Sequence, residues 1–368
     1  MRYFTATQNV KKIRAAHIMN NWLVILAAIG YLGVLFGVAY YAEKRQKLSR
    51  SLVSSPYVYA LSLAVYCTAW TFYGSVGQAS AQGIEFLAVY IGPPIMAALF
   101  WPVLRKIVRI CKVQRVTSLA DFISTRYGKN FSLAIAVTLL CMIGIIPYIS
   151  LQLKAISSSM HILSGTSPTA GLSGLFADNT LYIALVLAAF IILFGTRSID
   201  ASEKHVGLVA AVAFESLVKL IAFLAVGIFV TWGLFNGFGD IFNRIEAGGM
   251  QRLFTFSGSG SYTTWTSLVV LSMLAVVLLP RQFQMAVLEN VQESHLKKAI
   301  WLFPLYMLLI TVFVLPIAFG GKLLFAGTNV QADNYVLALP LQHGAGWLSL
   351  LVFIGGFSAA TSMIIVET

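Results

Sequence analysis

Long apolar stretches alternate with short polar connections along almost the whole chain. A helix that crosses a bilayer needs about 20 mainly apolar residues. About nine stretches of this kind occur, at residues 22–42, 57–77, 83–104, 131–150, 181–195, 206–234, 264–279, 300–320 and 346–367. The pattern therefore predicts an all-α polytopic membrane protein, with a basic leader at residues 1–21 and a transmembrane domain at residues 22–368.

Composition and charge fit this interpretation. Of the 368 residues, 58% are hydrophobic and only 10% are charged, and ordinary soluble domains do not reach the mean hydropathy of +0.83. The net charge of +12 would suit a nucleic-acid partner, but the lysines and arginines lie mainly in short connections between spans. This is the positive-inside pattern. We therefore expect a multi-pass protein of the bacterial inner (plasma) membrane, with its N-terminus outside, the lipid bilayer around it and no bound nucleic acid.

The second apolar stretch has the character of an interrupted helix. Hydroxyl and amide side chains recur from Thr68 onward, and Gly74 and Gly77 stand at positions where a continuous helix disfavours glycine. A break at membrane depth frees backbone groups, and transporters hold ions and solutes at such breaks. A continuous span that packs through its small residues is the alternative. The seventh stretch is a second candidate for a break, because Pro280 stops its helix and Arg281 follows at once.

Two charged residues lie inside the sixth stretch. Glu215 and Lys219 are four residues apart, so a helix places them on one face with their Cβ atoms roughly 5–6 Å apart. An ionisable group at mid-membrane costs at least ~2.5–3.5 kcal/mol, so the pair is expected to face the bundle interior, at a functional site. A structural pair that joins two helices is the alternative.

The last apolar stretch carries a row of hydroxyl groups. Ser358, Thr361 and Ser362 recur at helical spacing beside Gly355 and Gly356. Such oxygens suit a dehydrated Na⁺. Packing between helices through small residues is the alternative.

The fourth stretch contains Pro147 and turns polar at Tyr148, Gln152 and Lys154. A proline inside a helix produces a kink, so this stretch is interpreted either as a kinked packing helix or as a cavity wall. The remaining expectations concern the connections. They are an amphipathic helix on the inner surface at residues 117–130 and two Gly/Ser-rich outer connections, at residues 157–180 and 235–262.

Enzyme chemistry is not indicated by the sequence. The five histidines follow no repeating spacing, and Gly-x-Gly, as in SGSGS of the second outer connection, occurs without the strand and helix of a nucleotide site. We therefore expect no catalytic residues and no cofactor, with Na⁺ or H⁺ as the coupling ion.

Several features together resemble the sodium:solute symporter family. They are the extra first span, the broken second span, the segment T-x-L-x-D-F-x-x-x-R-Y-G from Thr117, Pro280 with Arg281, and G-G-F-S-A-A-T-S from Gly355. More closely still, the chain resembles the symporter-like membrane region at the N-terminus of certain bacterial sensor histidine kinases.

The resemblance implies a LeuT-like fold, in which two inverted five-helix repeats follow an added N-terminal helix. The first repeat corresponds to about residues 56–234, and a partial second repeat to about residues 263–368. Because the family has about thirteen spans, the chain is expected to be incomplete at its C-terminus. Solute and ion are expected between the broken first helices of the two repeats.

The resemblance also implies an ion site. In similar symporters, carbonyls of the broken span and two hydroxyls hold Na⁺, and these positions correspond to Ala64, Cys67, Thr361 and Ser362. The chain departs from the family pattern elsewhere. Tyr66 replaces the usual carboxylate of the second span, and Ser216 and Lys219 replace the Asp-x-x-Gln pattern of the sixth. Because an ammonium would repel or replace Na⁺, we hypothesise that Lys219 with Glu215 stands in for the coupling cation, so that transport is proton-linked or uncoupled.

For the solute, the resemblance favours an amino acid. The residues expected to bind it are Trp70, Tyr73, Tyr148, Gln152 and Pro280. The alternative function is a solute-sensing input domain of a sensor histidine kinase, with a kinase module and a response regulator as partners. Such a module would have to follow Thr368. A purely structural membrane anchor fits a broken span and a mid-membrane ion pair poorly.

Overall fold

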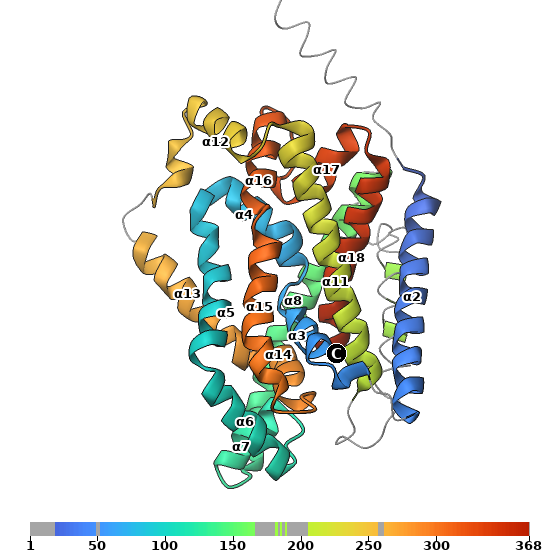
Figure 1. Cartoon of the computed structure of the whole chain (residues 1–368), viewed down its shortest axis with the longest axis vertical. Coiled ribbons are helices and arrows are strands. Elements are labelled where there is room, and N and C mark those ends of the chain that lie inside the picture. Colours follow the sequence, from blue (N-terminus) through green and yellow to red (C-terminus); the bar gives the residue numbers. More distant parts are fainter. Residues whose placement is uncertain are drawn as a thin grey trace, which may run out of the picture.

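The computed structural model describes residues 19–48, 52–165, 205–256 and 261–367, together with residues 181, 182, 185, 188 and 189. Every regular element among these residues is a helix, and most of the helices run along the long axis of the molecule (Figure 1). Six of them are long and apolar enough to cross a membrane, or seven if one bent pair counts as a single span. The predicted fifth span, 181–195, lies for the most part outside the described residues.

The first span is helix α2 (Asn21–Lys47), which lies at one edge of the molecule (Figure 1). The side chain of Asn20 caps its first turn by accepting a hydrogen bond from the backbone N–H of Trp22. Lysine and arginine side chains fill its last turn, where they complement the negative end of the helix dipole. Leu35 and Ala42 are fully buried, so one face of α2 packs on the bundle.

The second span is interrupted, as predicted. Helix α3 (Pro56–Ser62) continues into a 3-10 turn, η2 (Leu63–Tyr66), and the backbone is then extended at Cys67. A π-helical turn, η3 (Trp70–Gly74), and helix α4 (Ser75–Gln82) complete the span. The break therefore precedes both glycines. Gly77 lies inside α4, where its missing side chain gives room to Asp333.

The chain reverses direction after α4 (Figure 1). Gly83 adopts φ 61° with its Cα against the backbone of Leu253, a position that only glycine fits without strain. A short turn, η4 (Gly83–Leu87), then leads into α5 (Ala88–Leu99). Helices α6 (Trp101–Gln114) and α7 (Leu119–Arg126) follow at the predicted inner end, so a helix is present within residues 117–130. Its place on the inner membrane surface stays a prediction.

Helix α8 (Phe131–Ser164) is longer than the sequence pattern indicated. Pro147 lies within the helix without ending it, and residues 157–164, expected to be an outer connection, continue the helix. Serines are compatible with this because their hydroxyls bond back to the preceding turn, as Ser159 does to Ala155 and Ser164 to Met160. The helix ends at Gly165, in the left-handed conformation. Residues 166–180 lie outside the described part of the chain.

The sixth span is α11 (Val206–Ile228) with a π-helical end, η5 (Phe229–Leu234). The outer connection predicted after it is not an irregular loop, because it contains α12 (Phe238–Ala247) and a 3-10 turn, η6 (Gln251–Phe254). Ile241 and Ile245 of α12 are fully buried, so this helix packs by its apolar face onto the predicted outer end of the bundle.

The seventh span is also broken, as predicted. Helix α13 (Ser261–Leu278) ends before an extended Leu279, and α14 (Pro280–Phe283) and the π-helical turn η7 (Gln284–Leu288) continue at an angle of 51°. Pro280 begins the second half, where its missing N–H costs nothing.

The rest of the chain forms five further elements. The eighth span consists of α15 (His295–Thr311) and α16 (Val314–Leu324), and the ninth is α18 (Gly346–Glu367). Between them lie a 3-10 turn, η8 (Ala332–Asn334), and a short helix, α17 (Tyr335–Gln342), which the sequence analysis did not anticipate.

Candidate functional site

The break in the second span frees carbonyl oxygens that helix geometry would otherwise pair. Buried backbone groups need partners, and the carbonyls of Leu63, Ala64 and Cys67 have them. The Leu63 carbonyl accepts from the side-chain amide of Gln282, at 3.3 Å. The Ala64 carbonyl accepts from the N–H of Cys67, at 3.0 Å. The remaining bonds come from Lys219.

The ammonium of Lys219 lies against the break. Its Nζ donates to the carbonyl oxygens of Ala64, at 2.9 Å, and Cys67, at 2.7 Å. The side chain is fully buried. These carbonyls form the C-terminal end of a half-helix, which carries partial negative charge and favours a cation. Two of the carbonyls that the family resemblance assigns to the ion site thus accept hydrogen bonds from an ammonium group.

Glu215, one turn before Lys219 on α11, reaches a different neighbour. Thr361 on α18 donates its hydroxyl to the Glu215 carboxylate, and Ser358 donates to the Glu215 backbone carbonyl, at 2.9 Å. The second carboxylate oxygen, Oε2, has no hydrogen-bond partner among the described residues. The two charged residues therefore connect α11 to two elements, α18 and the break in the second span.

The other two residues suggested for the ion site, Ser362 and Ser216, differ in their partners, because the Ser216 hydroxyl has none among the described residues. Ser362 donates to the carbonyl of Ala359, at 3.2 Å. The backbone carbonyl of Ser216 accepts from the hydroxyl of Tyr306, at 2.7 Å. All the polar groups of the predicted ion site are buried, and Lys219 and Glu215 engage its two carbonyls and the Thr361 hydroxyl.

Helix α8 holds the start of the second half of the broken span. The side-chain oxygen of Gln152 accepts from the N–H of Ala69, at 3.0 Å, which caps the first free amide after the break. Beside it, the hydroxyls of Thr68 and Tyr148 lie 3.0 Å apart. The polar side of α8 is therefore positioned against the break.

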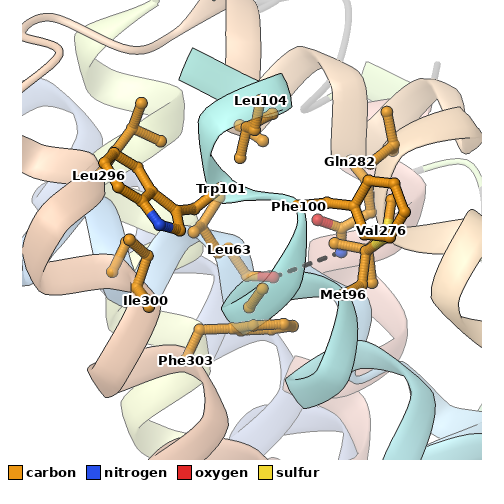
Figure 2. A pocket seen from close by; sticks show the side chains of 14 residues that line it. Leu63, Met96, Phe100, Trp101, Leu104, Val276, Gln282, Leu296, Ile300 and Phe303 are labelled. Carbon is orange, nitrogen blue, oxygen red and sulfur yellow. Dashed lines mark hydrogen bonds between the residues drawn. The ribbon is translucent and has the colours of Figure 1, made fainter.

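Hydrogen bonds also join the two broken spans to each other. Figure 2 shows Gln282, from the second broken span, bonded to the carbonyl of Leu63. Tyr59 donates to the carbonyl of Ala286, at 2.7 Å. The cavity around Gln282 in Figure 2 is apolar and only about 40 Å³ in volume, which is too small for an organic solute.

Two larger cavities flank the break. One of about 430 Å³ is lined by Trp70, Tyr73 and Gln152, together with η8. The other, of about 500 Å³, is lined by Trp70, Tyr148 and Pro280. The five residues predicted to bind solute are thus divided between two cavities, and Trp70 forms part of both walls. Each volume is within the ~300–1,000 Å³ typical of small-molecule sites.

One charged pair in the larger cavity was not predicted from the sequence. Arg281 Nη1 lies 2.6 Å from Glu367 Oε1, and the two side chains are 4% and 2% exposed. The position of Arg281 directly after Pro280 was a signal for its importance. Glu367 is the one acidic residue in the stretch 346–367, but the sequence gives no indication that these two residues meet.

A cluster of charges holds the end of the second broken span that is predicted to lie on the inner side. Arg105 and Arg109 on α6 pair with Glu293, at 3.1 and 2.9 Å. Hydrogen bonds from Arg109 and Arg105 lower the pKa of Glu293 to about 2. Nearby, Lys112 donates to the side chain of Asn290, at 3.0 Å. The basic helix α6 therefore binds the loop that follows η7.

Comparison with known proteins shows a symporter-like chain. No family profile matches it. The chain is 27% identical over 354 residues to an uncharacterized symporter, YhjB, of Bacillus subtilis (strain 168), an alignment that covers 93% of this chain and 66% of that protein. Its fold is similar to that of a Na⁺-coupled sialic acid symporter in a substrate-bound, outward-open state, with a TM-score of 0.66 at 12% identity. That match covers 94% of this chain and 72% of the other.

These relatives settle the coarser expectations. The chain is a multi-pass membrane protein with the fold of a Na⁺-coupled symporter, and the symporter relatives indicate a transporter and not an enzyme, as predicted. The LeuT-like repeats and the count of about nine spans stay predictions. Neither relative is a kinase, so the comparisons lend no support to the sensor-kinase alternative or to its kinase and response-regulator partners.

Proposed function

We propose that the chain is the core of a secondary transporter for a small organic solute, in which the ammonium of Lys219 takes the place of the coupling cation. The observation that carries the proposal is the pair of bonds from Lys219 Nζ to the carbonyls of Ala64 and Cys67. A transporter places its coupling ion at such unwound carbonyls. The protein would lie in the bacterial inner membrane.

The electrostatics argue against a Na⁺ ion at the same place. Two unit charges about 4 Å apart repel each other by ~4 kcal/mol at an effective dielectric constant near 20. A Na⁺ ion bound to the Ala64 and Cys67 carbonyls would have to displace the Lys219 ammonium from both of them. An ammonium that occupies the site permanently can change its charge only by exchanging a proton. Transport is therefore expected to be linked to H⁺ or to be uncoupled.

Glu215 is a second group on α11 that can bind or release the coupled proton. Its carboxylate is held by Thr361 on α18, while Lys219 is held by the break. A change of charge at either residue alters how firmly α11 is bound to one of these two elements. Protonation of either residue would therefore shift the position of the broken span relative to α18. Alternating access needs an equilibrium of this kind between two arrangements.

The test is uptake by the full-length protein in liposomes under imposed gradients. A mixture of radiolabelled amino acids, the class favoured by the resemblance, serves as the probe. We expect uptake by the wild type either to increase with a pH gradient or to be independent of every ion gradient. Any response to the pH gradient should be absent in Lys219→Met and Lys219→Gln. Lys298→Met, which changes an exposed lysine of α15, is the control. Strictly Na⁺-driven uptake that is unchanged in both Lys219 variants would overturn the proposal.

A second measurement needs no solute. A ligand that binds only the folded state raises the stability of that state, by an amount that grows with the logarithm of the ligand concentration relative to its dissociation constant. With Lys219 in the site, the thermal stability of the purified wild type is expected to be equal in NaCl and in choline chloride at one ionic strength. A Na⁺-specific increase that Thr361→Ala removes would show that Na⁺ binds beside Lys219, contrary to the proposal.

A further inference from the structure

The cavity of about 500 Å³ holds an ion pair that the coupling scheme does not use. Arg281 follows the break of the seventh span, and Glu367 lies at the end of α18. Both side chains line the cavity. They bond through one nitrogen and one oxygen, at 2.6 Å.

The pair leaves part of its hydrogen-bonding capacity unused. Arg281 Nε and Glu367 Oε2 are buried, and neither has a partner among the described residues. Arginine and a carboxylate can form two parallel bonds, and a purely structural buried pair is stable only when its remaining donors and acceptors are satisfied. A ligand could therefore accept a hydrogen bond from the unused donor of Arg281 and donate one to the unused acceptor of Glu367.

The guanidinium of Arg281 is also held in place. It lies over the ring of Tyr148, 4.8 Å from the ring centre, and its Nη2 approaches the Tyr148 hydroxyl at 3.5 Å. That hydroxyl lies 3.0 Å from the hydroxyl of Thr68 at the break of the second span. A ligand bound at Arg281 would thus be connected through one tyrosine to the unwound residues next to the Lys219 site.

We propose that Arg281 and Glu367 form the recognition site for a zwitterionic solute of the α-amino-acid type. The solute carboxylate binds the guanidinium of Arg281, and the solute ammonium binds the carboxylate of Glu367. The exchange conserves charge, because each residue trades its present partner for a ligand group of the same charge. The inference rests on the proposed transport function and names its solute class.

The rest of the cavity indicates the kind of side chain. Its wall includes Leu140, Leu271 and Leu278, with Tyr66 and Tyr90 at the side of the second and third spans. Charged residues of the wall are confined to Arg281 and Glu367 within the part of the chain that the structure describes. The cavity therefore suits an amino acid with an uncharged side chain.

The test is binding to the purified full-length protein, measured by thermal shift and then by direct titration. Each of the common L-amino acids is the probe, with D-galactose and acetate as comparison solutes. For the amino acid that binds most tightly, its N-acetyl derivative lacks the ammonium and its amide lacks the carboxylate. We expect each derivative to bind at least tenfold more weakly than the parent.

Two conservative variants test which residue binds the carboxylate of the solute and which binds its ammonium. Arg281→Lys keeps a cation beside Glu367, so that the fold is preserved, but loses the planar fork of the guanidinium. This variant should bind the parent amino acid at least tenfold more weakly than the wild type does. Glu367→Gln should also bind the parent more weakly, and the difference in affinity between the parent and its N-acetyl derivative should become smaller. Arg244→Lys, in the exposed pair with Asp240 on α12, is the matched control and should bind like the wild type.

Several results would overturn the inference. They are binding of no amino acid, binding of both derivatives as tightly as the parent, or unchanged affinity in Arg281→Lys and Glu367→Gln. These results are separate from a failure of the proposed function. Transport of a sugar with the expected Lys219 dependence would refute the zwitterion site alone, whereas selective amino-acid binding without any uptake would refute transport alone.

Discussion

The ammonium of Lys219 lies 2.7 Å from the carbonyl oxygen of Cys67, at the point where the second span unwinds. The two residues are 152 positions apart in the chain, so this bond fixes α11 against the break. Lys219 is also fully buried, and a buried ammonium is tolerated only where acceptors and negative charge surround it. The break and the lysine therefore depend on each other.

Removing the charge of Lys219 is expected to destabilise the protein strongly. Lys219→Met leaves the Ala64 and Cys67 carbonyls without this donor and leaves the buried Glu215 carboxylate without a cation on its helix. Loss of one member of a buried charged group costs on the order of 3–5 kcal/mol. Lys219→Met combined with Glu215→Gln removes both charges and should cost less than the sum of the single changes, by about 0.5–3 kcal/mol. Reversible unfolding in detergent measures all three variants, and strictly additive losses would contradict the coupling.

The break and the charged residues were predictable from the sequence for a physical reason. Charges, prolines and clusters of hydroxyls inside apolar stretches are costly in a membrane, so each of them marks a local exception. This reasoning located Lys219, Glu215 and both breaks. It placed the first break too near Gly74 and Gly77, because the site of unwinding depends on partners from other helices, such as Gln152 and Lys219.

The features that were missed depend on tertiary contacts or on short patterns. Arg281 and Glu367 meet across 86 residues of chain, and no spacing rule connects them. Helix α17 is too short to produce a span signal, and its seven consecutive buried residues acquire their environment only from the helices around them. The extension of α8 to Ser164 was missed because serines were interpreted as loop residues.

Gln152 is expected to act as a cap for the second half of the broken span. Gln152→Leu removes the acceptor for the N–H of Ala69, and loss of a capping side chain costs about 0.5–2 kcal/mol. Gln152→Glu keeps an acceptor and adds a negative charge at a helix N-terminus, where it is favourable. We therefore expect thermal unfolding to show a clear loss for the leucine variant and little change for the glutamate variant. Equal losses in the two would show that the side-chain volume matters more than the hydrogen bond.

Gly356 is expected to be essential for the packing of α18 against the broken span. A Cβ atom at this position would collide with the hydroxyl of Tyr73, and overpacking of a core costs about 1–3 kcal/mol. Gly356→Ala should therefore lower the melting temperature, and should also change the wall of the cavity that Tyr73 lines. The control is Gly33→Ala in α2, where no atom lies within 4 Å of the added carbon. A similar response from both glycines would indicate a general effect of alanine on helix propensity.

The contact between α6 and the loop after η7 is expected to weaken in acid. Hydrogen bonds from Arg109 and Arg105 lower the pKa of Glu293 from its ordinary value of 4.5 to about 2. A carboxyl group whose pKa is lower in the folded state stabilises the fold fully above its unfolded pKa, and this contribution is lost as the pH falls through the folded pKa. The stability difference between wild type and Glu293→Gln should therefore be constant near neutral pH and shrink between about pH 4.5 and pH 2.

Salt provides the independent check on this last contact. The arginine side chains are 45% and 60% exposed, so dissolved ions screen their attraction to Glu293, with a Debye length of only about 3 Å at 1 M. The difference between wild type and Glu293→Gln should consequently be small and should fall further in 1 M NaCl. Glu246→Gln, an exposed position on α12, should show neither the pH nor the salt dependence. A Glu293→Gln effect that persists in high salt and at low pH would mean that packing of α6, and not its charge, holds the loop.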